Sequence, residues 1–83
     1  MQATATQESV EAAIFRELAR LGPEPEYVKR DITFDALGID SLDLVEVAQL
    51  VEEEFGVLLK GEDMEKLQTV GDAIDLVVAR AAS

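Results

Sequence analysis

Few side chains in this sequence could do chemistry, and the most informative is a serine between two aspartates, in Asp40-Ser41-Leu42-Asp43. The chain has no cysteine and no histidine. It therefore lacks disulfides, thiol catalysis and the commonest general base and metal ligand. A nucleophilic serine needs an adjacent base, and only weak candidates such as Asp40, Asp43 or a lysine are present. The composition argues against a hydrolase that uses Ser41.

Asp40 and Asp43 could also bind a hard cation, because carboxylate oxygens suit Ca²⁺ and Mg²⁺. The sequence contains no spaced loop of the EF-hand type. We therefore expect loose screening by divalent ions and no dedicated metal site.

A helix predicted over residues 40–55 positions Ser41. Asp40 is its expected N-cap, with Asp43 three residues later as the partner in a capping box. Gly56 is the expected C-cap. Ser41 then lies in the first turn, where free N–H groups and the positive end of the helix dipole gather. A phosphate esterified to its hydroxyl would be stabilised there.

The two faces of this helix differ in character. At about 100° per residue, one apolar face is the predicted core side, formed by Leu44, Val47, Ala48, Val51 and Phe55. Leu42 and Val45 lie on the other side, beside Glu46, Gln49 and Glu53. Apolar residues ringed by carboxylates indicate a docking surface for another protein. Scattered apolar residues are also normal on a monomer, so the pattern alone leaves both interpretations open.

From about Ile32 onward, the sequence resembles the acyl carrier proteins of bacterial fatty acid and polyketide synthesis. The resemblance rests on Leu37-Gly38-Ile39-Asp40-Ser41-Leu42-Asp43, Val45-Glu46, Glu52-Glu53-Glu54-Phe55-Gly56 and Thr69-Val70-Gly71-Asp72-Ala73-Ile74. It implies that a phosphopantetheinyl transferase, using Mg²⁺, moves 4′-phosphopantetheine from coenzyme A onto Ser41. The arm then carries acyl groups as thioesters. Asp40 matches an aspartate that meets the transferase and its metal.

The resemblance also implies two sets of binding residues. Six residues match family positions that contact basic patches on ketosynthases, acyltransferases and other synthase enzymes: Leu42, Asp43, Val45, Glu46, Glu52 and Glu53. For the run 52–54, a solvated face is an equally good interpretation. The helices would part to shelter the acyl chain among Leu44, Val47, Val51, Phe55, Ile74 and Val77, although these residues equally suit a plain packed core.

We expect a discrete carrier that is not an enzyme and serves fatty acid synthesis, which the continuation Asp43-x-Val45-Glu46 slightly favours. A polyketide or other secondary pathway is the second choice. Asp40 before the serine fits acyl carriers better than peptidyl carriers, in which histidine is frequent there. A hypothesis of another class is an acidic helical adaptor without a prosthetic group. Lys60-Gly61 stands where family members often carry a proline, which leaves the shape of the third helix open.

The charge of the chain limits its partners. The formal net charge is −11, from 18 acidic and 7 basic residues. This argues against nucleic acid, whose phosphates require Lys and Arg. Nine carboxylates and one base lie between Asp40 and Glu65, which suggests partners with basic patches that are steered in electrostatically. There is no apolar run of membrane-spanning length and no signal peptide at the start, so we expect a cytoplasmic monomer that does not bind membranes.

Residues 1–83 are expected to form one all-α domain, a small four-helix bundle with a long loop between its first two helices and a frayed segment over residues 1–6. The other helices are predicted over residues 7–21, 61–67 (short) and from residue 70, capped by Thr69 with Asp72. The predicted buried stripes are Val10, Ile14, Leu18 and Leu21 in the first helix, and Val70, Ile74, Val77, Val78 and Ala81 in the last. Residues 33–37 are a candidate helical turn. The loop 22–39 should be anchored by Tyr27, Val28, Ile32, Phe34, Leu37 and Ile39, and Val57-Leu58-Leu59 should be a buried linker.

Overall fold

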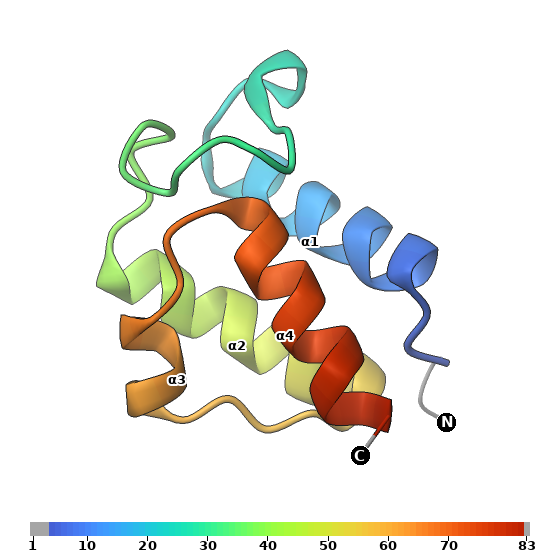
Figure 1. The fold of residues 1–83 in the computed structure, drawn as a ribbon. Helices are drawn as coiled ribbons and strands as arrows, with labels where there is room; N and C mark the ends of the chain where they lie inside the picture. The colour runs from blue at the N-terminus through green and yellow to red at the C-terminus, as the bar shows by residue number, and fades with distance from the viewer. Residues whose placement is uncertain (1–3, 83) are drawn as a thin grey trace.

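The computed structural model describes residues 4–82, which form helices and no strand; an isolated antiparallel β-bridge joins Thr33 and Thr69. In chain order the helices are α1 (Gln7–Leu21), the short 3₁₀ helix η1 (Pro25–Tyr27), α2 (Ser41–Phe55), α3 (Gly61–Glu65) and α4 (Val70–Ala82). Figure 1 shows the three longer helices around a common centre, with α3 beside the beginning of α2. The predicted all-α bundle is confirmed. None of the described helices is long and apolar enough to cross a bilayer.

Local capping fixes where α1 begins. Thr6 Oγ1 accepts a hydrogen bond from the Ser9 N–H at 3.1 Å, and Ser9 Oγ accepts one from the Thr6 N–H at 2.9 Å. These bonds satisfy N–H groups that a helix start would otherwise leave open. The segment predicted to fray, residues 1–6, includes residues 1–3, which lie outside the described part of the chain.

One apolar core joins the helices and the loops. Its buried members are Val10, Ala13, Ile14, Leu18, Val28, Phe34, Ile39, Val47, Val51, Phe55, Val57, Leu59, Val70, Ala73, Ile74 and Val77. Leu21 and Val78 pack against this core while half-buried. The prediction for Ala81 was wrong, because it lies exposed in the last turn of α4, past the point where the core ends.

The loop 22–39 is anchored as predicted at Val28, Phe34 and Ile39, which are buried. The predicted helical turn over 33–37 forms as a turn: Thr33 Oγ1 accepts from the Ala36 N–H at 3.1 Å. Tyr27 was wrongly predicted to be an anchor. It is the last residue of η1, a turn that was not predicted, and its side chain is 59% exposed.

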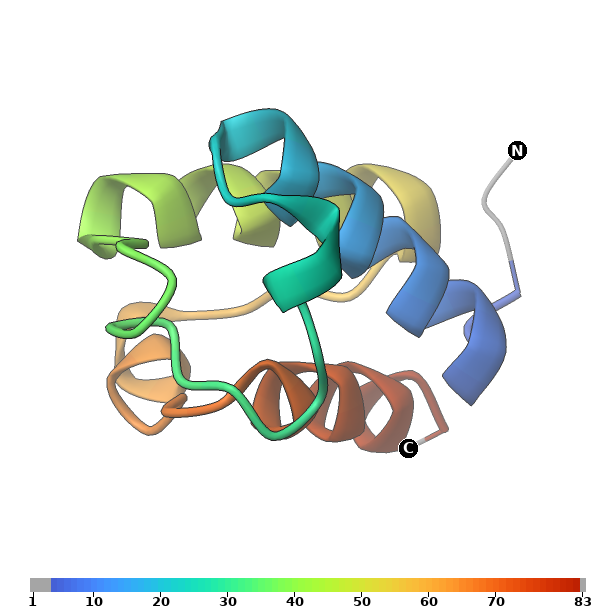
Figure 2. The ribbon, with the colours of Figure 1, turned by 90° about the horizontal axis from the view of Figure 1, so that it is seen from above.

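Backbone hydrogen bonds fasten this loop to the beginning of α4. The Val70 N–H donates to the Ile32 carbonyl at 3.0 Å, and the Gly71 N–H donates to the Arg30 carbonyl at 2.8 Å. These two N–H groups lie at the start of α4, where no intrahelical acceptor is within reach. Figure 2 shows the loop, in green, running past the start of α4. The loop is therefore held at the end of α4 that lies nearest the start of α2.

Thr69 and Asp72 cap α4 as predicted. Thr69 Oγ1 accepts from the Asp72 N–H at 3.1 Å, and Asp72 Oδ2 accepts from the N–H groups of Thr69 and Gln68 at 3.1 and 3.2 Å. These backbone donors, Thr69 first, hold the pKa of Asp72 below its ordinary value.

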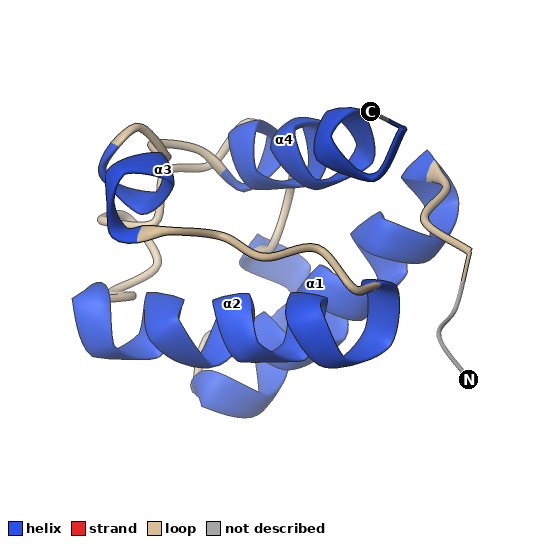
Figure 3. Cartoon of the chain, turned by 90° about the horizontal axis from the view of Figure 1, so that it is seen from below, coloured by secondary structure: helices blue, strands red, loops and turns tan. Residues whose placement is uncertain are grey.

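Two details of the segment between α2 and α4 differ from the prediction. The helix α3 ends at Glu65, two residues before the predicted Leu67. In the linker, Val57 and Leu59 are buried but Leu58 is 55% exposed. An extended chain turns alternate side chains to opposite sides, so the middle residue faces outward. Figure 3 shows this linker running between α2 and α4 on its way to α3.

Packing against the loop requires a residue without a side chain at position 71. Replacement of Gly71 by alanine should therefore destabilise the fold. A Cβ at this position would lie 2.9 Å from the Arg30 backbone oxygen. Such a conflict with backbone typically costs about 1–3 kcal/mol, more than the gain of up to about 1 kcal/mol from the better helix propensity of alanine. Urea unfolding of Gly71→Ala should show a lower midpoint. Gly61→Ala is the matched control, because a Cβ there meets nothing within 4 Å. Equal midpoints for the two variants would contradict this packing argument.

Candidate functional site

A reciprocal capping box defines the beginning of α2. Asp40 Oδ1 accepts from the Asp43 N–H at 3.0 Å, and Asp43 Oδ2 accepts from the Asp40 N–H at 3.4 Å. The Asp40 carbonyl accepts the first intrahelical bond, from Leu44, at 3.0 Å. Both carboxylates are thus turned onto the backbone, as predicted, and Ser41 is the first residue of the helix.

The chain that leads into the cap is itself held in place. Gly38 adopts a φ of 73°, in the left-handed region that favours glycine. Ile39 is buried, and its N–H donates to the Phe34 carbonyl at 2.9 Å. Because Ile39 is anchored in the core and Asp40 is the cap, Ser41 has a defined position at the molecular surface.

Ser41 is exposed, and within residues 4–82 its hydroxyl makes no hydrogen bond to another residue. The N–H groups of Ser41 and Leu42 likewise have no acceptor in the described part of the chain. Two open donors at the positive end of a helix of 15 residues favour an anion. The residues present therefore fit a phosphate ester on the Ser41 oxygen.

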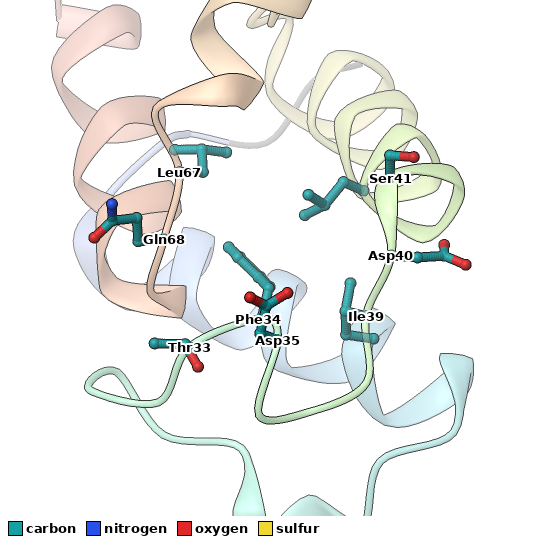
Figure 4. Close-up of a pocket in the computed structure, with 9 residues that line it drawn as sticks. Thr33, Phe34, Asp35, Ile39, Asp40, Ser41, Leu67 and Gln68 are labelled. Atoms are coloured by element: carbon teal, nitrogen blue, oxygen red, sulfur yellow. The ribbon is translucent and has the colours of Figure 1, made fainter.

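Two hollows meet at Ser41 and Leu44. The first, which we call the loop hollow, has a volume of about 360 Å³ and is lined by Thr33, Phe34, Asp35, Ile39, Asp40, Ser41, Leu44, Leu67 and Gln68. Figure 4 shows Ser41 and Asp40 on one side of it, with Leu67 and Gln68 opposite. The second, the α3 hollow, measures about 280 Å³ and is lined by Ser41, Leu44, Val45, Gly61, Met64 and Glu65. A group attached to Ser41 therefore has apolar surface within reach on both sides.

Of the six residues predicted to shelter an acyl chain, Leu44 lines both hollows. The other five lie deeper in the core: Val47, Val51, Phe55, Ile74 and Val77. Three further residues near Ser41 were not predicted to belong to the site: Phe34, Met64 and Leu67. Their apolar character was visible, but their closeness to Ser41 depends on contacts between distant segments.

The predicted docking surface comprises Leu42, Asp43, Val45, Glu46, Glu52 and Glu53. Leu42 and Val45 are 76% and 45% exposed, and Glu46, Glu52 and Glu53 are exposed as well. Asp43 is half-buried because its carboxylate belongs to the cap. The structure thus brings the two apolar side chains and the three glutamates to the surface of a single helix.

Arginines of α1 offset some of the α2 charge. Arg20 lies 3.5 Å from Glu46 and donates more closely to Glu17, at 3.1 Å from its Nε. The hydrogen bond and charge of Glu17, with a smaller contribution from Glu46, hold the pKa of Arg20 above its ordinary value. Glu52 and Glu53 have no ion-pair partner among residues 4–82. The negative charge of α2 that no ion pair offsets is therefore concentrated in its C-terminal half, at Glu52 and Glu53.

Comparison with known protein families gives a match to the family described as phosphopantetheine attachment site. The match covers residues 12–77, most of the chain, and includes α2 with Ser41.

The capping box makes a testable contribution to stability. Replacement of an N-cap aspartate by alanine costs about 1 kcal/mol, whereas asparagine caps equally well. Asp40→Ala should therefore lower the free energy of unfolding in urea, and Asp40→Asn should leave it nearly unchanged. Asp31→Ala is the control, an exposed aspartate whose side chain has no hydrogen bond in the described residues. If Asp40→Ala behaves like Asp31→Ala, the cap does not fix the start of α2.

Proposed function

The chain belongs to the phosphopantetheine-attachment family, and from this premise we propose that it is a discrete acyl carrier protein with its 4′-phosphopantetheine arm on Ser41. The family match means that the group is attached covalently to this domain. The observation that supports Ser41 is its exposed, unbonded hydroxyl at the start of a capped helix, where two hollows meet. The hypothesis of an adaptor without a prosthetic group is at odds with this family.

In the attachment step, the Ser41 oxygen bonds to the phosphorus of coenzyme A that carries the pantetheine. The pyrophosphate bond breaks, 3′,5′-ADP leaves, and the hydroxyl proton passes to a base of the transferase. The open N–H groups of Ser41 and Leu42 lie where they can donate to oxygens of the new phosphodiester. We propose that Asp40, besides capping α2, contacts the transferase and its metal.

The chain's own residues then position the arm and what it carries. The arm supplies a thiol that holds an acyl group as a thioester. A protein without cysteine or histidine need not perform chemistry itself, and we propose that this one is not an enzyme. Leu44, on the wall of both hollows, would meet the acyl group first. The buried residues Val47, Val51, Phe55, Ile74 and Val77 would line the space behind it when the helices part.

Carrier domains of this family interact with a phosphopantetheinyl transferase and with synthase enzymes. We propose that the docking surface defined above contacts basic patches on those enzymes. Two exposed apolar side chains beside carboxylates suit a partner that combines positive charge with a small apolar contact.

We propose fatty acid synthesis as the pathway, supported by Asp43-x-Val45-Glu46 after the attachment serine. The second candidate is a polyketide or other secondary pathway. The departure from the family pattern at Lys60-Gly61, the N-cap and first residue of α3, keeps this second candidate open. Loading the protein and measuring which ketosynthase accepts it distinguishes the two.

Replacement of Ser41 by alanine tests the attachment site. Incubation with coenzyme A, Mg²⁺ and a broad-range transferase should add one phosphopantetheine to the wild type, as measured by intact mass. Ser41→Ala should stay folded and gain no mass. Ser9→Ala is the control, because the Ser9 hydroxyl is used inside the α1 cap, and it should be modified like the wild type. Modification of Ser41→Ala, or no modification of the wild type by any competent transferase, would refute the proposal.

Reversal of charge at Glu46 tests the docking surface. Glu46→Lys should weaken binding to a fatty acid ketosynthase about tenfold at low salt, equivalent to about 1.4 kcal/mol. The difference should shrink as salt screens the charges. Glu26→Lys makes the same change in net charge at an exposed residue of η1. Equal affinities for the two variants at low salt would show that Glu46 does not meet the partner.

A further inference from the structure

The short helix α3 has little to hold it in place. It has five residues, and none of their side chains is fully buried. Isolated helices of this length are not stable in water. Met64 and Leu67 pack against the core only in part, so other contacts must keep α3 where it is.

The strongest such contact is an ion pair between Asp63 of α3 and Arg80 near the end of α4. Arg80 Nη2 lies 2.9 Å from Asp63 Oδ1 and Nη1 lies 3.2 Å from Oδ2, so the contact is bidentate. The Asp63 side chain is only 13% exposed. The Arg80 side chain is 37% exposed, so the pair is partly shielded, and its bidentate geometry makes it more specific than an ordinary surface salt bridge.

The same two side chains also hold the segment that precedes α3. Arg80 Nη1 donates to the Leu58 carbonyl at 3.3 Å, and Asp63 Oδ2 accepts from the Lys60 N–H at 3.0 Å. The linker and the start of α3 are thus fixed together onto α4. The hydrogen bond from Arg80 and the Lys60 N–H lower the pKa of Asp63 to about 2, so the carboxylate is ionised at neutral pH.

The position of α3 matters because its segment lines both hollows beside Ser41. Gly61, Met64 and Glu65 form one side of the α3 hollow, and Leu67 and Gln68 form one side of the loop hollow. The far end of this segment is held separately, by the hydrogen bond from the Phe34 N–H to the Gln68 carbonyl at 3.0 Å. Release of Asp63 would therefore free α3 to move away from α2 between its two remaining anchors, the buried Leu59 and the bonded Gln68.

We propose that the Asp63–Arg80 pair is a latch that positions α3 against α2 and so determines how much of an attached acyl chain is sheltered beside Ser41. The two are positioning residues, since they act through α3 and do not touch the chain. This inference rests on the proposed carrier function and assigns to it the residues that control sheltering.

A comparison of two acyl loads tests the latch. The wild type, Arg80→Gln and the control Arg16→Gln are loaded with acetyl or octanoyl arms, and loading is verified by intact mass. Arg16 also forms an ion pair, with Glu54 at 2.6 Å, but between α1 and α2. In the wild type and Arg16→Gln, the octanoyl form should melt at a higher temperature than the acetyl form, because a sheltered chain binds only the native state. In Arg80→Gln this increment should fall by at least about half, because the wall of the hollow is no longer held.

The difference in melting temperature between the octanoyl and acetyl forms distinguishes a latch from a general contribution to stability. A merely structural role would lower both melting temperatures together and leave their difference unchanged, which would overturn the inference. An absent increment in the wild type would overturn it too. Arg80→Lys keeps the charge but not the bidentate geometry, and should restore the increment only in part.

Hydrogen exchange of the unloaded protein tests the latch without any attached group. Asp63→Asn should speed exchange of the amides of residues 63–67 on the order of tenfold, with those of α1 unchanged. Unchanged exchange in α3 would overturn the latch. If loading fails but α3 exchange rises, the proposed function fails and the mechanical role of the pair survives, so the two failures are distinguishable. If Arg80→Gln does not fold, Asp63→Asn replaces it in the comparison of acetyl and octanoyl loads.

Discussion

The reciprocal cap between Asp40 and Asp43 is the interaction on which the site depends. Each carboxylate accepts a backbone N–H of the other residue, so α2 begins at Ser41 and its hydroxyl takes no part in the cap. Two negative side chains can therefore flank the oxygen that we propose carries the phosphate, because their charge is directed to the helix backbone. The N–H groups of Ser41 and Leu42 stay open for that phosphate.

The rest of the fold serves to hold this helix start at the meeting point of three segments. The loop 22–39 is fastened to α4 by backbone bonds at residues 30 and 32, and ends in the buried Ile39 just before the cap. The helix α3 approaches from the other side and is tied to α4 through Asp63 and Arg80. Ser41 therefore lies at the surface between this loop and the short helix α3. In the proposed function, this arrangement would anchor the arm and leave room beside it for an attached chain.

Local chemistry let the sequence predict the helices α1 and α2, the caps at Asp40 and Thr69, and the exposed pair Leu42 and Val45. Burial of single residues outside helices was less predictable. Tyr27 and Leu58 are apolar enough for the core, but the 3₁₀ turn and the extended linker face them outward. The contacts of Gly71 with Arg30 and of Asp63 with Arg80 join segments far apart in the chain. The periodicity of a single helix cannot reveal such contacts. The two hollows beside Ser41 could not be predicted for the same reason, because their walls come from segments far apart in the chain.

The most direct test of this account is to locate the phosphopantetheine on the wild-type chain by fragmentation mass spectrometry after treatment with a transferase. The sequence offers serine hydroxyls at residues 9, 41 and 83. The account predicts that the whole of the added mass lies on Ser41. Added mass on Ser9, Ser83 or any threonine would contradict it.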